Sequence, residues 1–274
     1  MTNLFDKYRY GLLKIGFSDP YIFEDLFDNE KYLDCRHSNS IEELLDYAVQ
    51  NFSKENPSMN QYNDWEANTE DGAKDFVLIH PHGAIFRSSM LLLPGVMGAI
   101  LLIRKYHIGQ TRKGGGYPYL EHPLEVGYNL WKEKFPIDVV VAGYCHDLLE
   151  DTKCTEKEII MNCGQDVLNI VKAVSNDESL SDKENWEKKK EKYINSVEAG
   201  GEKAIAVSVM DKICNLQSFF DQYDKEGPGL WKSFNRGKEQ KIWFEKAVLE
   251  MAKKHWQHPL LNQYEQLIKK QENC

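Results

Sequence analysis

Apolar residues recur with the period of an α-helix along most of the chain, and the alternation that is typical of strands is scarce. A first helix is predicted at 41–51, where Ser40 can cap the first turn and Glu43 completes a capping box. Residues 53–75 are polar and indicate a loop or an exposed connection. From about residue 84 onward, the pattern predicts a dense series of helices, at 85–108, 122–134, 137–150, 155–162, 164–175, 183–198, 201–220 and 238–256.

This pattern predicts an all-α fold, in which a helical bundle carries an acidic, mainly helical N-terminal extension. We expect the extension at residues 1–83, the main domain at 84–256, and a C-terminal helix or tail at 257–274. The sequence contains no internal repeat and no low-complexity tract. One large helical domain is therefore the expected architecture.

The net charge of −9 argues against general nucleic-acid binding, because nucleic acids are themselves polyanions. Most of this charge lies in residues 1–95, where 16 Asp and Glu against 8 Lys and Arg give −8. Residues 104–123, in contrast, contain four basic residues and a single acid. A local cationic island of this kind favours a small polyanionic ligand.

Compartment and membrane contact can be predicted from three features. The longest apolar run, at 90–103, is too short to span a bilayer and is interrupted by proline and glycine. The first residues carry scattered charges and lack the apolar core of a signal peptide. The six cysteines include no CxxC pair and are typical of reduced core residues. We expect a cytoplasmic protein without membrane contact.

The stretch "AGYCHDLLEDT", residues 142–152, places ionisable side chains in an apolar run. The three valines before it are compatible with a strand, but Pro136 is a typical helix start, and we predict helix. At about 100° per residue, one arc of roughly 140° then contains His146, Asp147, Glu150 and Asp151. A solvated face is the ordinary interpretation of such an arc. Histidine directly before aspartate favours a site for zinc, manganese or iron, and the stretch alone is compatible with both interpretations.

Two further side chains are candidate metal ligands. His122 opens a predicted helix just before Pro123, where a packing or capping role is equally compatible. Asp211 interrupts the apolar helix predicted at 201–220. Burying an unpaired carboxylate costs several kcal/mol, so Asp211 requires a cation partner, either a lysine or a metal. Asn215 lies four residues later, on the same helix face.

Together, His122, His146, Asp147 and Asp211 form a His…His-Asp…Asp pattern, which resembles the HD superfamily of metal-dependent phosphohydrolases. The resemblance is closest to the small alarmone hydrolases and to the hydrolase domain of RelA/SpoT-type enzymes. Three blocks within roughly residues 100–220 carry it, in the family's order: "HIGQTRKGGGYPYLEHPLEV", "HDLLEDT" and "MDKICNL".

The resemblance implies an HD-domain bundle in which these four side chains hold one divalent ion, usually manganese. It implies that Glu150 and Asp151 are catalytic and orient or deprotonate the attacking water. It also implies a substrate site that contains Arg112, Lys113, Tyr119 and Asn215. The implied reaction is hydrolysis of guanosine 3′,5′-bis(diphosphate), ppGpp, to GDP, or of pppGpp to GTP, with release of pyrophosphate.

Three alternatives stay open at this point. An HD phosphatase for another nucleotide, such as NADPH or a nucleoside phosphate, would share the metal and the base. An HD-related di-iron oxygenase would need more histidines, and His107 is the only additional one in the three blocks. A non-catalytic nucleotide sensor would not need Glu150 and Asp151. Tyr144 stands where the family usually has an aliphatic residue, which predicts a narrowed or reshaped pocket. The sequence is also compatible with an oligomer and with either acid as the general base.

Overall fold

The computed structural model describes Met90 and residues 93–107, 109–112, 119–176, 182–234 and 236–274, together with short strands between residues 11 and 87. Side chains are described from Met90 onward, except those of residues 182–185. The chain divides into two compact units, Met1–Met97 and Gly98–Cys274. The domain boundary expected near residue 84 stays a prediction.

The described elements of the first unit are β-strands, where the sequence predicts mainly helix. One antiparallel sheet has the order β1 (Gly11–Leu13), β5 (Val77–His80), β6 (Gly83–Arg87). A second sheet contains β2 (His37–Ser38), β3 (Glu66–Asn68) and β4 (Lys74–Asp75). The strands β3 and β4 lie within the predicted loop, and the helix predicted at 41–51 lies outside the described residues.

In the sheet β1–β5–β6, short apolar segments explain why the sequence pattern did not predict strands. A run of four to eight apolar residues is compatible with a strand or a buried helix, and periodicity does not distinguish them. In the sequence, Pro81 lies between the two runs and Gly83 begins the second, which is a hairpin signal. The helix predicted at 85–108 begins only at Val96, because Pro94 and the positive φ of Gly95, 80°, form a turn before it.

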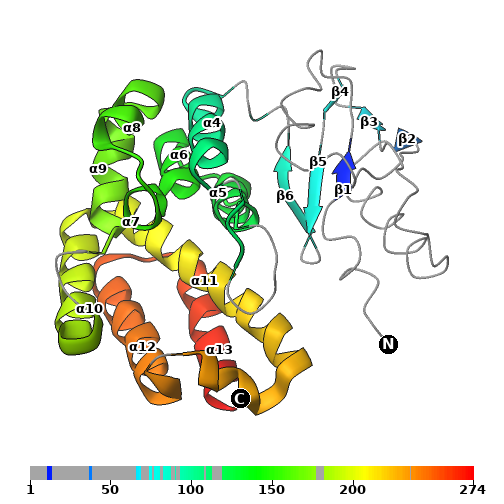
Figure 1. The fold of residues 1–274 in the computed structure, drawn as a ribbon. Coiled ribbons are helices and arrows are strands. Elements are labelled where there is room, and N and C mark those ends of the chain that lie inside the picture. Colours follow the sequence, from blue (N-terminus) through cyan, green and yellow to red (C-terminus); the bar gives the residue numbers. More distant parts are fainter. Residues whose placement is uncertain are drawn as a thin grey trace. The chain divides into compact units, whose positions relative to one another are not determined.

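The second unit confirms the predicted helical bundle (Figure 1). Its described helices are α4 (Val96–His107), of which the first two residues belong to the first unit, α5 (Glu121–Lys132), α6 (Ile137–Cys145), α7 (Leu148–Asp151), α8 (Glu156–Cys163), α9 (Gln165–Val174), α10 (Asp182–Ala199), α11 (Gly201–Glu226), η2 (Gly227–Ser233), α12 (Gly237–His255) and α13 (Leu260–Glu272). The C-terminal segment expected as helix or tail thus contains a helix. None of the described helices is long and apolar enough to cross a membrane.

Helix α11 is central to this bundle (Figure 1). Helices α5, α6, α9, α10, α12 and α13 and the 3-10 helix η2 all contact it. Residues 204–214 of α11 are buried without interruption, as expected of a helix enclosed by others. Asp211 and Lys212 are the only charged residues in that run, so α11 carries an ion pair into the core.

Helices α5 and α6 pack closely because glycines face the contact. A β-carbon at Gly127 would lie 2.4 Å from the ring of Tyr144, and one at Gly143 would lie 2.5 Å from Cδ1 of Leu130. Only glycine allows this approach without displacing the neighbouring side chain. Tyr144 is fully buried and fills space between the helices, and it does not belong to the lining of the cavity described below. This close contact fixes the helices that carry the two histidines.

Candidate metal centre and substrate cavity

His146 and Asp147 lie between helices α6 and α7, whereas the sequence predicts one continuous helix at 137–150. The backbone of Asp147, with φ −93° and ψ −6°, stays in the right-handed helical region but lies well away from ideal α-helical values. Helical spacing continues on both sides of this break, so the residue pattern does not reveal it. The ionisable side chains of the stretch nevertheless line one cavity: His146, Asp147, Glu150 and Asp151.

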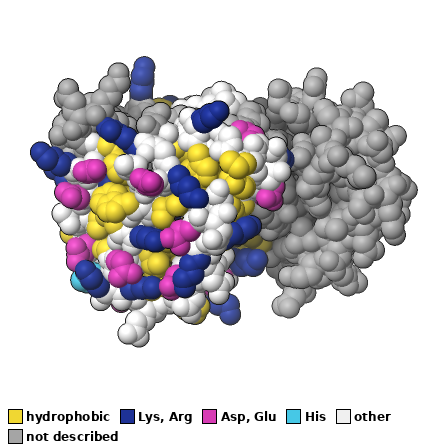
Figure 2. Space-filling model, turned by 90° about the horizontal axis from the view of Figure 1, so that it is seen from below, with side chains coloured by type: hydrophobic (Ala, Val, Ile, Leu, Met, Phe, Trp, Pro, Cys, Tyr) yellow, Lys and Arg dark blue, Asp and Glu magenta, His cyan; other side chains and the backbone are white. Residues whose placement is uncertain are grey.

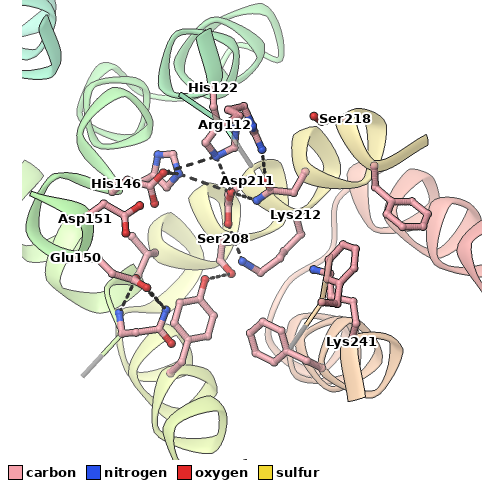
Figure 3. A pocket seen from close by; sticks show the side chains of 18 of the residues that line it. Arg112, His122, His146, Glu150, Asp151, Ser208, Asp211, Lys212, Ser218 and Lys241 are labelled. Carbon is pink, nitrogen blue, oxygen red and sulfur yellow. Dashed lines mark hydrogen bonds and ion pairs between the residues drawn. The ribbon is translucent and has the colours of Figure 1, made fainter. Parts of the chain in front are cut away.

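The His…His-Asp…Asp side chains come together from separate parts of the chain (Figure 3). Nε2 of His122, in the first turn of α5, lies 3.0 Å from Oδ1 of Asp211 and 3.7 Å from Oδ2 of Asp147. Nε2 of His146 lies 3.0 Å from Oδ2 of Asp147 and 3.6 Å from Oδ1 of Asp211. Ligand atoms of His122, His146 and Asp147 all lie within 4.8 Å of one another, so this cluster could hold a metal ion.

The orientation of His146 fits a divalent ion. Its Nδ1 lies 2.8 Å from the carbonyl oxygen of Gly143, which only accepts, so Nδ1 is the N–H donor. In the neutral ring Nε2 then has a lone pair, yet this buried atom faces the Asp147 carboxylate without a hydrogen-bond partner. Burial opposes a charge on the ring, but Asp147 raises the pKa of His146 well above its usual range. The position therefore favours a cation, and a histidine bound to a carbonyl through its other nitrogen is typical of metal sites.

The other ligand candidates have the protonation states that metal binding requires. Burial opposes ionisation of Asp147, but the neighbouring His146 holds its pKa well below the usual range. Burial also opposes ionisation of Asp211, whose pKa Lys212 holds well below the usual range. Burial lowers the pKa of His122 to about 4. At neutral pH the site thus offers two carboxylates and a neutral His122, which are the ligand forms.

Asp211 uses its two oxygens for different partners. Nζ of Lys212 donates to Oδ2 at 2.6 Å. Oδ1 faces the two imidazoles and accepts a hydrogen bond from Nδ2 of Asn215. The sequence left a lysine and a metal as alternative cation partners for Asp211. The structure supplies the lysine on one oxygen and directs the other oxygen toward the histidines.

The two acids predicted to be catalytic have different contacts. Glu150 accepts hydrogen bonds from the backbone N–H of Asn176 at 3.1 Å and from its side-chain amide at 2.9 and 2.8 Å. Oδ2 of Asp151 lies 2.8 Å from the hydroxyl of Tyr119. Burial, assisted by the charge of Asp147, raises the pKa of Asp151 to about 6. Glu150 is therefore held by the segment after α9, and Asp151 by Tyr119.

The residues predicted to bind substrate lie near the same cluster, as far as the described chain extends. Nη2 of Arg112 donates to Oδ1 of Asn215 at 2.6 Å. Tyr119 lines the cavity too, and its hydroxyl lies 2.5 Å from Oδ2 of Asp147. Lys113 lies outside the described residues.

A cavity of about 1130 Å³ contains this cluster and is lined by cationic side chains from several elements. We use "basic wall" for Arg112, Lys190, Lys212, Arg236 and Lys241. Trp186, Tyr193 and Phe244 supply aromatic surface beside the wall. On the outer face shown in Figure 2, in contrast, acidic and basic side chains are intermixed, and no extended basic surface is visible there.

Sequence reasoning missed most of the basic wall. None of Lys190, Lys212, Arg236 and Lys241 is among the site residues predicted above. Burial and the nearby Lys212 lower the pKa of Lys190 to about 8. The available signal was the position of Lys212, a charged residue in an apolar helix directly after a candidate ligand.

Family comparison agrees with this geometry. A protein-family model described as "HD domain" matches residues 99–236, half of the chain. The chain belongs to the HD-domain family. The matched range includes the His…His-Asp…Asp cluster, both acids and every member of the basic wall except Lys241.

Curated relatives resemble part of the chain. A guanosine-3′,5′-bis(diphosphate) 3′-pyrophosphohydrolase, MESH1, from Xenopus tropicalis is 37% identical over 102 residues, which are 36% of this chain and 55% of the relative. The bifunctional (p)ppGpp synthase/hydrolase SpoT of Escherichia coli K12 is 29% identical over 122 residues, which are 44% of this chain and 17% of the relative. The chain thus spans about half, or much less, of the length of these relatives.

Solved structures extend the likeness to the fold. The 1.85 Å crystal structure of lmo0812 from Listeria monocytogenes EGD-e is 31% identical, with a TM-score of 0.50, over 54% of this chain and 96% of that chain. A second structure, described as a metazoan ortholog of SpoT that hydrolyzes ppGpp, is 22% identical, with a TM-score of 0.54, over 64% of this chain and 94% of that chain. At that identity the second likeness supports the fold alone.

Proposed function

We propose that the protein is a metal-dependent hydrolase that releases pyrophosphate from the 3′ position of ppGpp or pppGpp, forming GDP or GTP. The observation that carries this proposal is one cavity that contains both the His…His-Asp…Asp cluster and the basic wall. A nucleotide with two separate diphosphate groups requires both features, because one group reacts while the other must be balanced by cations. The names of the relatives favour the same substrate.

We assign the metal to His122, His146, Asp147 and Asp211. Two nitrogen and two oxygen donors are suited to manganese, and also to zinc or iron. A divalent ion bound there would stabilise charge on the phosphoryl oxygens and lower the pKa of water. At neutral pH Asp147 and Asp211 are carboxylates and His122 is a neutral imidazole, and the hydrogen bond of His146 to Gly143 directs the His146 ring.

Glu150 and Asp151 are the proposed acids that act on the attacking water. A general base is most effective when its pKa lies near the working pH, and a pKa of about 6 gives Asp151 this property. The three hydrogen bonds from Asn176 fix the Glu150 carboxylate, so Glu150 is suited to orienting the water. Both acids line the cavity beside the metal cluster.

Arg112, Lys190 and Lys212 are the proposed phosphate contacts. The planar guanidinium of Arg112 is suited to two-point contact with phosphate oxygens, and its hydrogen bond to Asn215 holds it at the cavity. Asn215 and Lys113 are the proposed contacts to the nucleoside. We place the reaction in the cytoplasm, where reduced cysteines such as Cys145 and Cys214 are expected.

The direct test uses purified, metal-stripped protein incubated with ppGpp, with and without Mn²⁺. We expect GDP and pyrophosphate in equal amounts, and only with the metal. Turnover of NADPH or a mononucleotide without turnover of ppGpp would instead assign the protein to the other HD phosphatases. Saturable ppGpp binding without any product would assign it as a sensor.

A further inference from the structure

We infer that Tyr119 is a positioning residue of the metal centre, whose hydroxyl holds the carboxylates of Asp147 and Asp151 in their working orientation. This inference rests on the metal centre of the proposed function. It gives Tyr119 a role different from the substrate contact that the family resemblance implies. It also predicts that Tyr119 acts on the metal through a ligand and not on the nucleotide.

The hydroxyl of Tyr119 is already engaged on both sides. Its oxygen lies 2.5 Å from Oδ2 of Asp147 and 2.8 Å from Oδ2 of Asp151. A phenol carries one proton, so it donates to one carboxylate at a time, and a short bond to a carboxylate is a strong one. Oδ2 of Asp147 is also the oxygen that lies 3.0 Å from Nε2 of His146. Tyr119 therefore contacts the very atom that faces the proposed ion.

A backbone hydrogen bond and two neighbouring rings fix the position of the Tyr119 side chain. Its backbone N–H donates to the carbonyl of Gln110 at 2.8 Å. One face stacks on His107, with ring centroids 4.9 Å apart and planes inclined by 30°. The side chain of Gln110 in turn holds Nδ1 of His107 at 2.8 Å. Tyr119 also meets the ring of His122 edge to face, at 6.1 Å and 73°.

This arrangement accounts for a buried histidine that the proposed reaction does not use. His107 is 1% exposed, and burial lowers its pKa, so the ring stays neutral and serves as a packing surface. In the sequence analysis, His107 had a possible role only as an additional ligand of a di-iron site. Its stacking on Tyr119 instead makes it the support of the tyrosine that contacts Asp147. A chain of contacts thus runs from α4 to the metal ligand.

The test is the Tyr119→Phe variant, which keeps the ring and removes the hydroxyl. Losing such a contact to a metal ligand typically weakens metal affinity or activity about 10- to 100-fold. We expect Mn²⁺ binding, measured by equilibrium dialysis without substrate, to weaken within that range. We also expect kcat for ppGpp to fall while KM stays within about twofold of the wild-type value.

Tyr106→Phe is the matched control. It removes a hydroxyl that lies 2.5 Å from a carboxylate oxygen of Glu158, at the contact between α4 and α8 and outside the proposed machinery. We expect wild-type Mn²⁺ affinity in this variant. Thermal unfolding of both variants in EDTA checks that the fold is retained.

Each outcome decides the inference. Wild-type Mn²⁺ affinity in Tyr119→Phe overturns it, and a raised KM with unchanged affinity restores the substrate contact. The binding measurement needs no turnover. A wild-type protein that binds Mn²⁺ but leaves ppGpp intact would therefore overturn the proposed function alone, whereas a wild-type protein that binds no Mn²⁺ would overturn the inference.

Discussion

The His…His-Asp…Asp cluster and the basic wall share one cavity but are built differently. The imidazoles of the cluster are almost fully buried, with 2% exposure for His122 and 4% for His146, and hydrogen bonds or ion pairs fix their positions. Arg112 of the basic wall comes from a loop, Arg236 directly precedes α12, and the lysines come from helices α10 to α12. These side chains are less buried, apart from Lys212. The difference indicates that the cluster determines the chemistry, whereas the wall determines which phosphorylated molecule is held.

The largest expected effect is at the cluster. Asp147→Ala removes a proposed ligand and should abolish metal binding and hydrolysis together. The loss of metal affinity should exceed the roughly 100-fold that is typical when a residue hydrogen-bonded to a ligand is removed. Metal content by elemental analysis and product formation from ppGpp are the two measurements. Full metal content in this variant would contradict the assignment of Asp147.

The second-largest effect is expected at Glu150, where a substitution should slow the chemical step without removing the metal. Glu150→Ala should retain the metal but lower kcat by about 10²- to 10⁴-fold, the range for a residue that orients or deprotonates the reacting water. Single-turnover rates at saturating Mn²⁺ provide the measurement. Loss of metal from this variant would place Glu150 among the ligands and contradict its role.

A smaller effect is expected at the basic wall. Lys190→Ala should raise KM for ppGpp roughly 10- to 150-fold with little change in kcat, because a charged hydrogen bond contributes about 1.5–3 kcal/mol. Lys188 lies exposed on the same helix, so Lys188→Ala is the control and should leave KM unchanged. If Lys190→Ala instead lowered kcat by a similar factor and left KM unchanged, Lys190 would be assigned to the chemical step.

The wall also predicts a pH dependence. Because burial and Lys212 lower the pKa of Lys190 to about 8, its charge is present below that pH and is lost above it. KM for ppGpp should therefore rise as the pH increases from 7 to 9. Arginine stays charged throughout this range, so Lys190→Arg should reduce the rise. A rise of equal size in both proteins would exclude Lys190 as its source.

The smallest expected effect is on stability, at the contact between α5 and α6, the helices that carry His122 and His146. Gly127→Ala places a β-carbon 2.4 Å from the ring of Tyr144, so α5 and α6 must move apart. Overpacking of this kind costs about 1–3 kcal/mol of unfolding free energy. Urea unfolding of the metal-free protein measures the cost, and an unchanged unfolding free energy would show that this contact adapts freely.

The contrast between the His…His-Asp…Asp cluster and the basic wall also explains which parts of the site could be predicted from the sequence. The helices of the second unit carry a 3.6-residue pattern, and His146-Asp147 and Asp211 stand out because they interrupt apolar runs. Lys190 gives no such signal, because a lysine on a charged helix is ordinary and only tertiary packing turns it into the cavity. The break after Cys145 also follows from local backbone geometry and not from residue pattern.

The strands of the first unit show a second limit of the sequence. The runs Val77–His80 and Gly83–Arg87 are too short for periodicity to distinguish strand from helix. Pairing with β1, more than 60 residues away along the chain, adds a neighbour that no local pattern encodes.

The central claim is that one divalent ion lies among His122, His146, Asp147 and Asp211. Anomalous diffraction at the manganese edge, from crystals grown with Mn²⁺, tests it most directly. The account predicts one strong peak within bonding distance of Nε2 of His146 and of the Asp147 carboxylate. A cavity without a peak, with Lys212 occupying the space between the imidazoles and the carboxylates, would contradict it.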